Sequence, residues 1–384
     1  MNKILEHVLQ KDGNIKYLLL NNRAGKTWVL QNENIKTALG LYQPASMKGK
    51  LIKRFMSLFA KSDWLISALR IQVSYYDIKK QFVQLMEEIF QEQNLEYTFF
   101  LGTPGVHRKI TIQIAKGEKI FGYCKMTDSK EISQMFEREK GILTWLYEKG
   151  VCHIPRCLYC GPYINDIQMF VQTTEKTVDS KTLNELQQEH IHFLQDIYHK
   201  TKTSCSYEES DFYKTVKSFE KEILYYSKEE DIKRDQGIIK YVNEQASKNH
   251  EFSFYHGDFT MWNTLMVKDT LYAFDFEYAT RTYPPMLDIF HLFTQQELYI
   301  NTRNATEIFV KFESVFVDGN FANLFENPYL QYIFYLVHII EFYLKRDKNK
   351  FSKEIIGNLK TWYLLLEMNI KKCISDTEKG KRLW

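Results

Sequence analysis

The sequence predicts an α+β fold with two lobes, a small β-rich lobe followed by a larger helical lobe. Two observations carry this prediction. Between residues 96 and 175, short runs of β-branched and aromatic residues are separated by turn residues, a pattern typical of strands. From residue 183 onward, most apolar residues recur at helical spacing. A chain of 384 residues is long enough for two or three packed units.

Residues 1–94 are predicted to form an N-terminal extension of unknown role. Within it, residues 16–30 favour two short strands joined by a turn. A short helix is expected in 32–44 and a second helix in 48–62, because apolar residues recur there at helical spacing. Residues 75–90 are predicted to be helical as well.

Residues 95–176 are predicted to form the β-rich lobe. Three antiparallel strands are expected in 96–126, and a helix that ends at Gly150 follows them. Two more strands are expected in the runs IPRCLYCG and IQMFVQTTE. The helical lobe, 177–384, is predicted to contain one hairpin, made by LMVKD and LYAFDF and turning at 268–270.

Composition narrows the classes of function. With 51 basic against 48 acidic residues, the chain has no general signal for binding nucleic acid. The run Tyr329–Leu344 is interrupted by polar residues and favours a buried helix over a membrane span. No leader segment is recognised at the start and the six cysteines form no regular framework, so we expect a cytoplasmic protein without disulfides. Cys157 and Cys160 superficially resemble half a zinc site, but a strand is the preferred interpretation.

The two most informative runs are HGDFTMWN, residues 256–263, and FDFEYA, residues 274–279. Asp258 and Asn263 precede one strand of the predicted hairpin and Asp275 follows the other, so these oxygens can converge. An Asn oxygen with an Asp carboxylate suits Mg²⁺, which takes further ligands from substrate phosphates. Asp258 would then be available to accept a proton from a hydroxyl group. Turn and cap roles are the alternative for each residue taken alone.

The spacing of His256, Asp258 and Asn263, with Asp275 following, resembles the aminoglycoside phosphotransferase and choline kinase-like family, which has the protein kinase-like fold. The resemblance covers about residues 97–344. It implies that Asp258 is the catalytic base and that Asn263 and Asp275 hold Mg²⁺ while ATP is the phosphoryl donor. Glu277 matches the last residue of the DFE motif and either reaches the metal or forms a salt bridge within the loop.

The resemblance also implies a nucleotide site in the β-rich lobe. Lys125 matches the lysine that contacts the α- and β-phosphates, and Glu139 is chosen over Glu137 as its acidic partner. Gly102 and Gly105 lie in LGTPGVHRK, where backbone amides would cover phosphates, although an ordinary hairpin turn explains them equally well.

The run MFVQTTE resembles the linker between the lobes, and Phe170 and Val171 are expected to line the adenine pocket. Two further positions match the family but are interpreted as structural. His199 would pack against or cap its helix, and Asp288 would begin a helix after two prolines.

The expected activity is transfer of the γ-phosphoryl group of ATP to a hydroxyl group of a small molecule, such as an aminoglycoside, an amino alcohol or a sugar. The alternatives are a kinase acting on a cell-surface glycan or its precursor, and a nucleotide-binding pseudokinase or scaffold. A protein kinase is disfavoured because the run after Asp275 lacks an A-P-E segment. The oligomeric state stays open.

One basic cluster in the N-terminal extension lies outside the resemblance. It is formed by four residues, Lys48, Lys50, Lys53 and Arg54. Contact with an anionic glycan, a lipid or the surface of a membrane is one interpretation. A solvated helix face is the preferred one.

Overall fold

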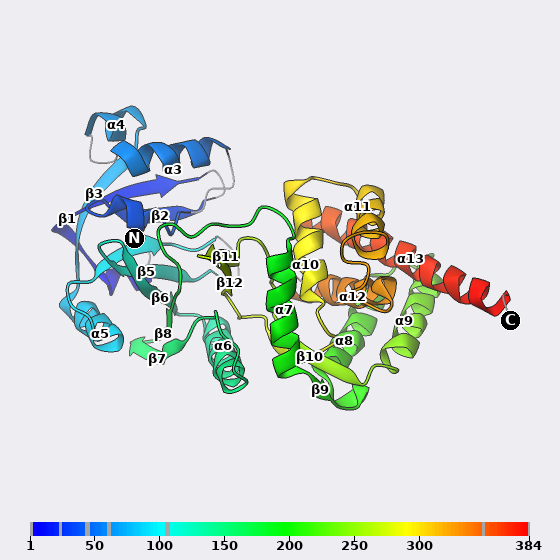
Figure 1. Ribbon diagram of the computed structural model, residues 1–384. Coiled ribbons are helices and arrows are strands. Elements are labelled where there is room, and N and C mark those ends of the chain that lie inside the picture. Colours follow the sequence, from blue (N-terminus) through cyan, green and yellow to red (C-terminus); the bar gives the residue numbers. More distant parts are fainter. Residues whose placement is uncertain are drawn as a thin grey trace. The chain divides into compact units, whose positions relative to one another are not determined.

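The computed structural model describes residues 3–22, 25–42, 47–59, 63–103, 108–347 and 350–382. The chain divides into two compact units (Figure 1). The first, called the sheet unit, comprises residues 1–148, 152–182 and 265–277. The second, called the helical unit, comprises residues 149–151, 183–264 and 278–384. The predicted α+β class is therefore confirmed.

The sheet unit is built on an eight-stranded sheet with the order β3-β1-β2-β4-β5-β6-β8-β7. Each neighbouring pair is antiparallel. The strands of this sheet are β1 Leu9–Asn21, β2 Thr27–Gln31, β3 Gln72–Ile78, β4 Glu96–Phe100, β5 Ile110–Lys116, β6 Lys119–Thr127, β7 Cys157–Ile164 and β8 Ile167–Thr173. The helices of the unit are α1 Lys3–Glu6, α2 Ile35–Ala38, α3 Met47–Phe59, α4 Asp63–Ala68, α5 Lys80–Phe90 and α6 Lys130–Glu148.

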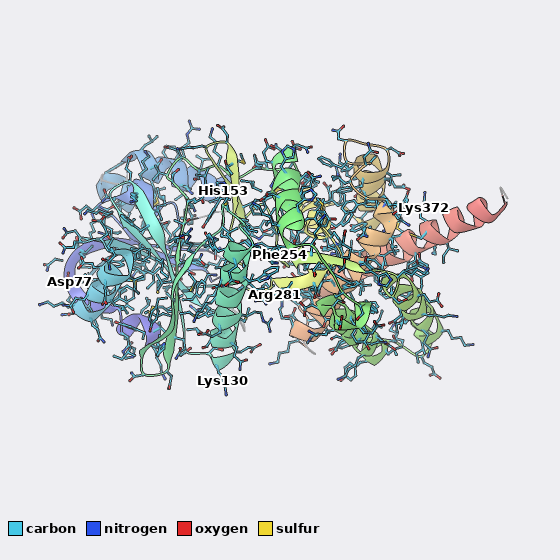
Figure 2. The ribbon with its side chains drawn as sticks, turned by 60° about the horizontal axis from the view of Figure 1, so that its bottom comes forward. Asp77, Lys130, His153, Phe254, Arg281 and Lys372 are labelled. Atoms are coloured by element: carbon cyan, nitrogen blue, oxygen red, sulfur yellow. The ribbon has the colours of Figure 1, made fainter. Side chains whose placement is uncertain are left out.

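The strands and helix predicted between residues 95 and 176 are present. Strands β4, β5 and β6 follow one another as antiparallel neighbours, α6 comes next, and β7 and β8 complete the sheet. This is the order of strands and helix that the sequence predicted. Lys130, at the start of α6, is labelled among the side chains of Figure 2.

One predicted helix is partly wrong. Residues 75–90 were expected to be helical throughout, but only α5 is, and Tyr75 and Tyr76 lie in β3. Strand β3 contains Val and two Tyr residues, which favour a strand, and it pairs with β1 along most of its length, with Tyr76 opposite Ile15. Aromatic residues in a run with apolar residues are compatible with either periodicity over so short a stretch.

The N-terminal segment is part of the same sheet. Strand β2 pairs with β4 through Trp28 opposite Phe100 and Val29 opposite Phe99. The rings of Trp28 and Phe100 stack with centroids 5.1 Å apart. The predicted boundary at residue 94 thus falls within a compact unit whose hydrogen-bonded sheet continues across it.

The sheet has apolar cores on both faces. On one face, Phe82 and Met86 of α5 pack with Tyr17, Ile112 and Val171. On the other face, α2, α3 and α4 cover the N-terminal strands with a second core that includes Leu18, Leu30, Leu39, Met56 and Ile66. On the face that carries the side chains of Lys125 and Phe170, α6 places Phe136 5.7 Å from the ring of Phe170.

The helical unit contains seven α-helices among its described residues. They are α7 Gln188–Thr201, α8 Asp211–Tyr226, α9 Ile232–Ala246, α10 Asp288–Gln295, α11 Ala305–Phe312, α12 Pro328–Asp347 and α13 Lys353–Arg382. Short helical turns are η1 Tyr207–Glu209, η2 Gln296–Ile300 and η3 Glu313–Val317. Three strands that the sequence did not predict, β9 Thr203–Ser204, β10 Glu251–Tyr255 and β13 Thr280–Tyr283, form a small sheet.

The predicted hairpin is present as β11, Thr264–Val267, and β12, Thr270–Ala273. Most of it belongs to the sheet unit. There Met266 forms an isolated β-bridge with Lys181, and the backbone N–H of Ala273 donates to the carbonyl of His153 at 3.2 Å.

The run Tyr329–Leu344 lies in the largely buried α12, as expected. Within the described ranges, every helix is too short or too polar to cross a membrane.

We predict that Phe82→Ala, in α5, destabilises the sheet unit even though the residue lies outside the region of family resemblance. Its side chain is fully buried in the core beneath the sheet, so truncation should cost about 3–5 kcal/mol of unfolding free energy. Urea unfolding provides the measurement. Tyr75→Ala, at a half-exposed position in β3, is the control and should cost far less. Equal losses in the two variants would contradict the shared core.

Candidate functional site

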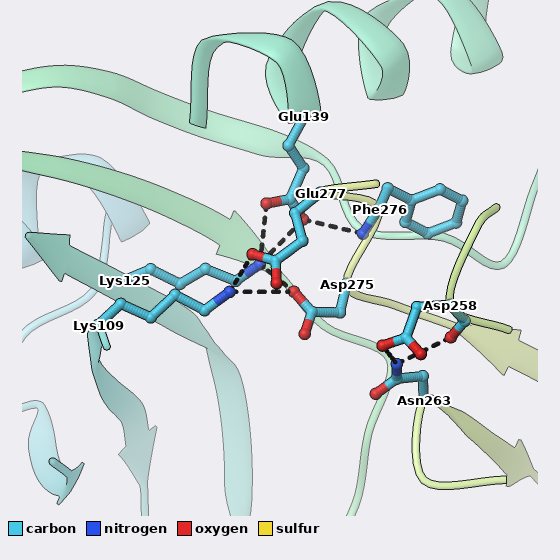
Figure 3. A network of polar contacts seen from close by, with 8 residues as sticks. All are labelled: Lys109, Lys125, Glu139, Asp258, Asn263, Asp275, Phe276 and Glu277. Carbon is cyan, nitrogen blue, oxygen red and sulfur yellow. Dashed lines mark hydrogen bonds and ion pairs between the residues drawn. The ribbon is translucent and has the colours of Figure 1, made fainter. Parts of the chain in front are cut away.

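The centre of the candidate site in the sheet unit is an ion pair between β6 and α6. The Nζ of Lys125 lies 2.9 Å from both carboxylate oxygens of Glu139, and both residues are buried (Figure 3). The structure therefore brings together the lysine and the glutamate that the sequence selected. Glu137, the other acid considered, lies elsewhere and accepts a hydrogen bond from the Sγ of Cys160.

Asp275 joins this pair from the loop after β12. Its Oδ1 lies 2.7 Å from the Nζ of Lys125. Its φ of 70° lies in the left-handed region, which Asp adopts more readily than most residues. The next backbone N–H, of Phe276, donates to Oε1 of Glu139 at 3.2 Å. Glu139 thus holds both the lysine and the loop that carries Asp275.

Lys109 is a further member of the cluster that the sequence analysis missed. Its ammonium group forms an ion pair with Glu277 and lies 3.6 Å from Oδ1 of Asp275. Lys109 is two residues before Thr111, which pairs with Lys125 across β5 and β6. Side chains two residues apart lie on the same face of a strand, so this spacing was the available signal.

The charges of the cluster nearly balance, with two ammonium groups facing three carboxylates. Burial opposes protonation of Lys109 and Lys125, but the surrounding carboxylates, Asp275 foremost, outweigh it and raise the pKa of both lysines. Burial raises the pKa of Glu277 to about 7, although Lys109 opposes the change. Both lysines are therefore cationic at neutral pH.

The same carboxylates fit a divalent cation. Ligand oxygens of Glu139, Asp275 and Glu277 lie within 4.8 Å of one another, and carboxylate oxygens are the ligands that Mg²⁺ prefers. Glu139 is committed to Lys125 and to the backbone of Phe276. Asp275 and Glu277 are the two members on the loop, so they are the better candidates for a metal.

Gly102 precedes β5 and has a φ of 78°. A Cβ at this position would approach the carbonyl oxygen of Lys109 to 2.3 Å, so the backbone here requires glycine. Gly105, the other glycine assigned to the phosphates, lies outside the described residues. The phosphate role of both stays a prediction.

Phe170 and Val171 are neighbours in β8 and their side chains lie on opposite faces of the sheet. Phe170 is opposite Lys125 in the register, and the Nζ of Lys125 is 5.4 Å from its ring centroid. Val171 packs instead in the core beneath the sheet, with Ile112 and Cys124. Of the two residues assigned to adenine, only Phe170 therefore lies on the face of the charged cluster.

In the helical unit, the carboxylate of Asp258 is held on both oxygens. The Nδ2 of Asn263 donates to Oδ2 at 2.8 Å and to the carbonyl of Asp258 at 2.9 Å (Figure 3). The Nε2 of His291, in α10, lies 3.3 Å from Oδ1. Asp258 still has about a third of its side chain exposed. His291 is a second residue that the sequence analysis missed, although it lies one helical turn after Asp288.

Asp288 fixes the backbone that precedes Asp258. It begins α10, as expected, and its two carboxylate oxygens accept from the N–H groups of His256, at 2.8 Å, and Gly257, at 3.1 Å. Burial raises the pKa of Asp288 to about 7, and these two N–H groups oppose the change. Gly257 has a φ of 80°, and a Cβ there would lie 2.7 Å from the carbonyl oxygen of Tyr278. The HGD glycine is thus required by the turn.

Comparisons with known proteins find similarity to solved structures alone. A scan against protein-family models and a search of curated proteins return no match. Among solved structures, the chain is similar to the choline kinase LicA from Streptococcus pneumoniae, with 14% identity, a TM-score of 0.44, and coverage of 74% of this chain and 98% of that chain. It is also similar to an ethanolamine kinase from Plasmodium vivax, with 15% identity, a TM-score of 0.44, and coverage of 86% and 95%.

A third similar structure is a thermostable mutant of the aminoglycoside phosphotransferase APH(4)-Ia, in ternary complex with ADP and hygromycin B. Its identity is 10% and its TM-score 0.48, with coverage of 74% of this chain and 97% of that chain. These proteins are of the kinds that the sequence motifs resemble. At such identities and scores, what this chain does has to be inferred from its own residues.

We predict that Lys125→Met strongly destabilises the sheet unit. The substitution leaves the buried carboxylate of Glu139 without its main counter-ion, which should cost about 3–5 kcal/mol. The double variant Lys125→Met/Glu139→Leu removes both charges and should recover a large part of that loss. Thermal and urea unfolding of the two variants and of Glu139→Leu give the coupling free energy between the two side chains. A double variant no more stable than Lys125→Met would contradict the pairing.

Proposed function

We propose that the protein is an ATP-dependent phosphotransferase that moves the γ-phosphoryl group to a hydroxyl group of a small molecule. The observation that carries the proposal is the buried Lys125–Glu139 pair, which also holds Asp275 in place. A lysine held by a helix glutamate and turned toward a loop aspartate supplies the charges that a nucleoside triphosphate and its metal require. The helical unit supplies a carboxylate suited to act on the acceptor.

In the proposed mechanism, Lys125 neutralises charge on the nucleotide phosphates and Lys109 contributes a second cation. Both ammonium groups lie close to the same oxygen of Asp275. A phosphate that shares a metal with Asp275 would therefore be within reach of both lysines. Glu139 acts as a positioning residue through Lys125 and the Phe276 N–H. Phe170 would contact the adenine ring, and the backbone of the following residues would bind its edge.

Asp275 and Asn263 would hold Mg²⁺, and Glu277 is a further candidate ligand. Because the Nδ2 of Asn263 is engaged with Asp258, its amide oxygen is the atom suited to a cation. When bound, Mg²⁺ neutralises charge on the transferring phosphoryl group. If Glu277 held the metal, Lys109 would be released from that carboxylate and would be available to a phosphate.

Asp258 would orient the acceptor hydroxyl and take its proton. As the acceptor oxygen bonds to the γ-phosphorus, the bond from that phosphorus to the β,γ-bridging oxygen breaks and ADP leaves. Asn263 and His291 fix the carboxylate before the acceptor arrives, so little reorganisation is needed.

Two observations on the helical unit bear on the class of acceptor. Trp262 is exposed and its ring lies 6.5 Å from that of Tyr299, and an exposed aromatic pair suits either a sugar ring or a cationic amine. Glu297, an acid considered for a cationic acceptor, is buried and paired with Arg303. A sugar or glycan hydroxyl is therefore favoured over an aminoglycoside or choline. A nucleotide-binding scaffold is the competing function. A wild-type protein that binds nucleotide but transfers no phosphoryl group would support it.

We predict that Asp258→Asn lowers phosphoryl transfer by about 10³-fold, because loss of a positioned base typically costs 10²–10⁴-fold. Affinity for an ATP analogue should stay nearly unchanged, since the proposed phosphate contacts lie in the sheet unit. Transfer from labelled ATP to a panel of sugars, amino alcohols and aminoglycosides is the measurement. Asp269→Asn, in the exposed turn of the β11–β12 hairpin, serves as the matched control. Equal transfer by wild type and Asp258→Asn would exclude the proposed base.

We predict that Asp275→Asn weakens binding of Mn²⁺, used as a probe for Mg²⁺, by at least about tenfold in the presence of a non-hydrolysable ATP analogue. Electron paramagnetic resonance counts the bound Mn²⁺ independently of turnover. Glu277→Gln separates two roles for that residue. A similar loss would make it a ligand, and an unchanged Mn²⁺ affinity would leave it as a partner of Lys109. Unchanged affinity in Asp275→Asn would contradict the proposed metal site.

A further inference from the structure

Helix α3 carries apolar side chains on two faces. Ile52 and Met56 pack against the core that covers the N-terminal strands. Leu51, Phe55 and Leu58 follow one another at helical spacing on a different face and are 52%, 44% and 67% exposed. A helix that only covers a sheet needs one apolar face, so the second face calls for a separate explanation.

The next helix also exposes a large apolar side chain. In α4, Ile66 is buried in the same core while Trp64 is 76% exposed. Helices α3 and α4 follow each other on one side of the sheet unit (Figure 1). Leu51, Phe55, Leu58 and Trp64 are here called the α3–α4 patch. Four large apolar side chains exposed on two consecutive helices are more than the isolated exposed residues that are common on protein surfaces.

The run of sequence that contains the patch is rich in basic residues. Residues 47–64 contain five basic residues and one acid, Asp63, so the remaining chain has 46 basic and 47 acidic residues. The whole positive net charge of the protein therefore comes from this run. Arg54 is exposed beside the apolar side chains. Lys53 is directed inward, where its Nζ donates to the carbonyl of Tyr42 at 2.8 Å and burial lowers its pKa.

We propose that the α3–α4 patch docks the protein on a membrane surface that carries anionic lipid headgroups. Exposed Trp, Phe and Leu side chains in a run rich in Lys and Arg are the combination found in helices that lie in the membrane interface. The apolar side chains enter the boundary between headgroups and acyl chains, and the basic residues meet the phosphates. A second copy of this chain would place like charges opposite one another, which disfavours self-association through the patch. The proposal is independent of the proposed enzymatic function.

Vesicle binding by the full-length protein tests the proposal. Vesicles of phosphatidylcholine with phosphatidylglycerol should bind the wild type, vesicles of phosphatidylcholine alone should bind it weakly, and added salt should reduce the difference. Leu58→Ser/Trp64→Ser should lower the partition coefficient by about tenfold or more, since it removes both of the most exposed apolar side chains of the patch. Arg54→Glu should lower binding to the anionic vesicles selectively.

The matched control is Val310→Ser, which replaces an exposed apolar residue of α11 in the helical unit. Its binding should equal that of the wild type, and thermal unfolding should show all variants folded. Equal binding by the wild type and the double variant would overturn the proposal, as would equal binding to the two kinds of vesicle. Sedimentation velocity measures whether the protein forms a dimer through the patch. A dimer that the double variant abolishes would assign the patch to a second copy of the chain.

Discussion

The buried ion pair between Lys125 and Glu139 is the interaction on which the rest of the candidate site depends. A lone carboxylate at a position as buried as Glu139 would be costly, so the pair fixes α6 against β6. The same carboxylate receives the Phe276 N–H, and the same lysine reaches Asp275. One buried glutamate therefore determines where the loop after β12 lies. Such an arrangement favours a site that is positioned before any ligand binds.

The sheet that supports this pair is larger than the chemistry requires. Strands β4 to β8 and α6 suffice to place Lys125, Glu139 and Phe170, whereas β1 to β3 and five short helices enlarge the sheet and cover it. The N-terminal segment shares a core with the strands of the site through Phe82 and Met86. Stability of the site and integrity of the N-terminal segment are therefore linked. The outer helices of this segment also present the α3–α4 patch, which has no part in the nucleotide chemistry.

Much of the site could be predicted from the sequence because its residues stand in short runs with characteristic spacing. The residues predicted in this way are Asp258, Asn263, Asp275 and the Lys125–Glu139 pair. Lys109 was missed because strand register brings it to Glu277, and His291 was missed because the phase of α10 brings it to Asp258. Both contacts join segments that are far apart in the sequence. Val171 was assigned to the same side as Phe170, although adjacent strand residues alternate between faces. In the fold, the part of β3 after residue 74 was predicted to be helical, because pairing with β1, a long-range contact, decides its state.

Hydrogen–deuterium exchange with a Mg²⁺-bound, non-hydrolysable ATP analogue tests the central claim most directly. The claim is that Lys125, Asp275 and Asp258 serve one nucleotide. It predicts slower exchange on nucleotide binding in β6, in the loop 274–278 and in the loop 256–264, and loss of this protection in Lys125→Met/Glu139→Leu. Absence of protection in these three segments at saturating nucleotide, or equal protection in the double variant, would contradict the account.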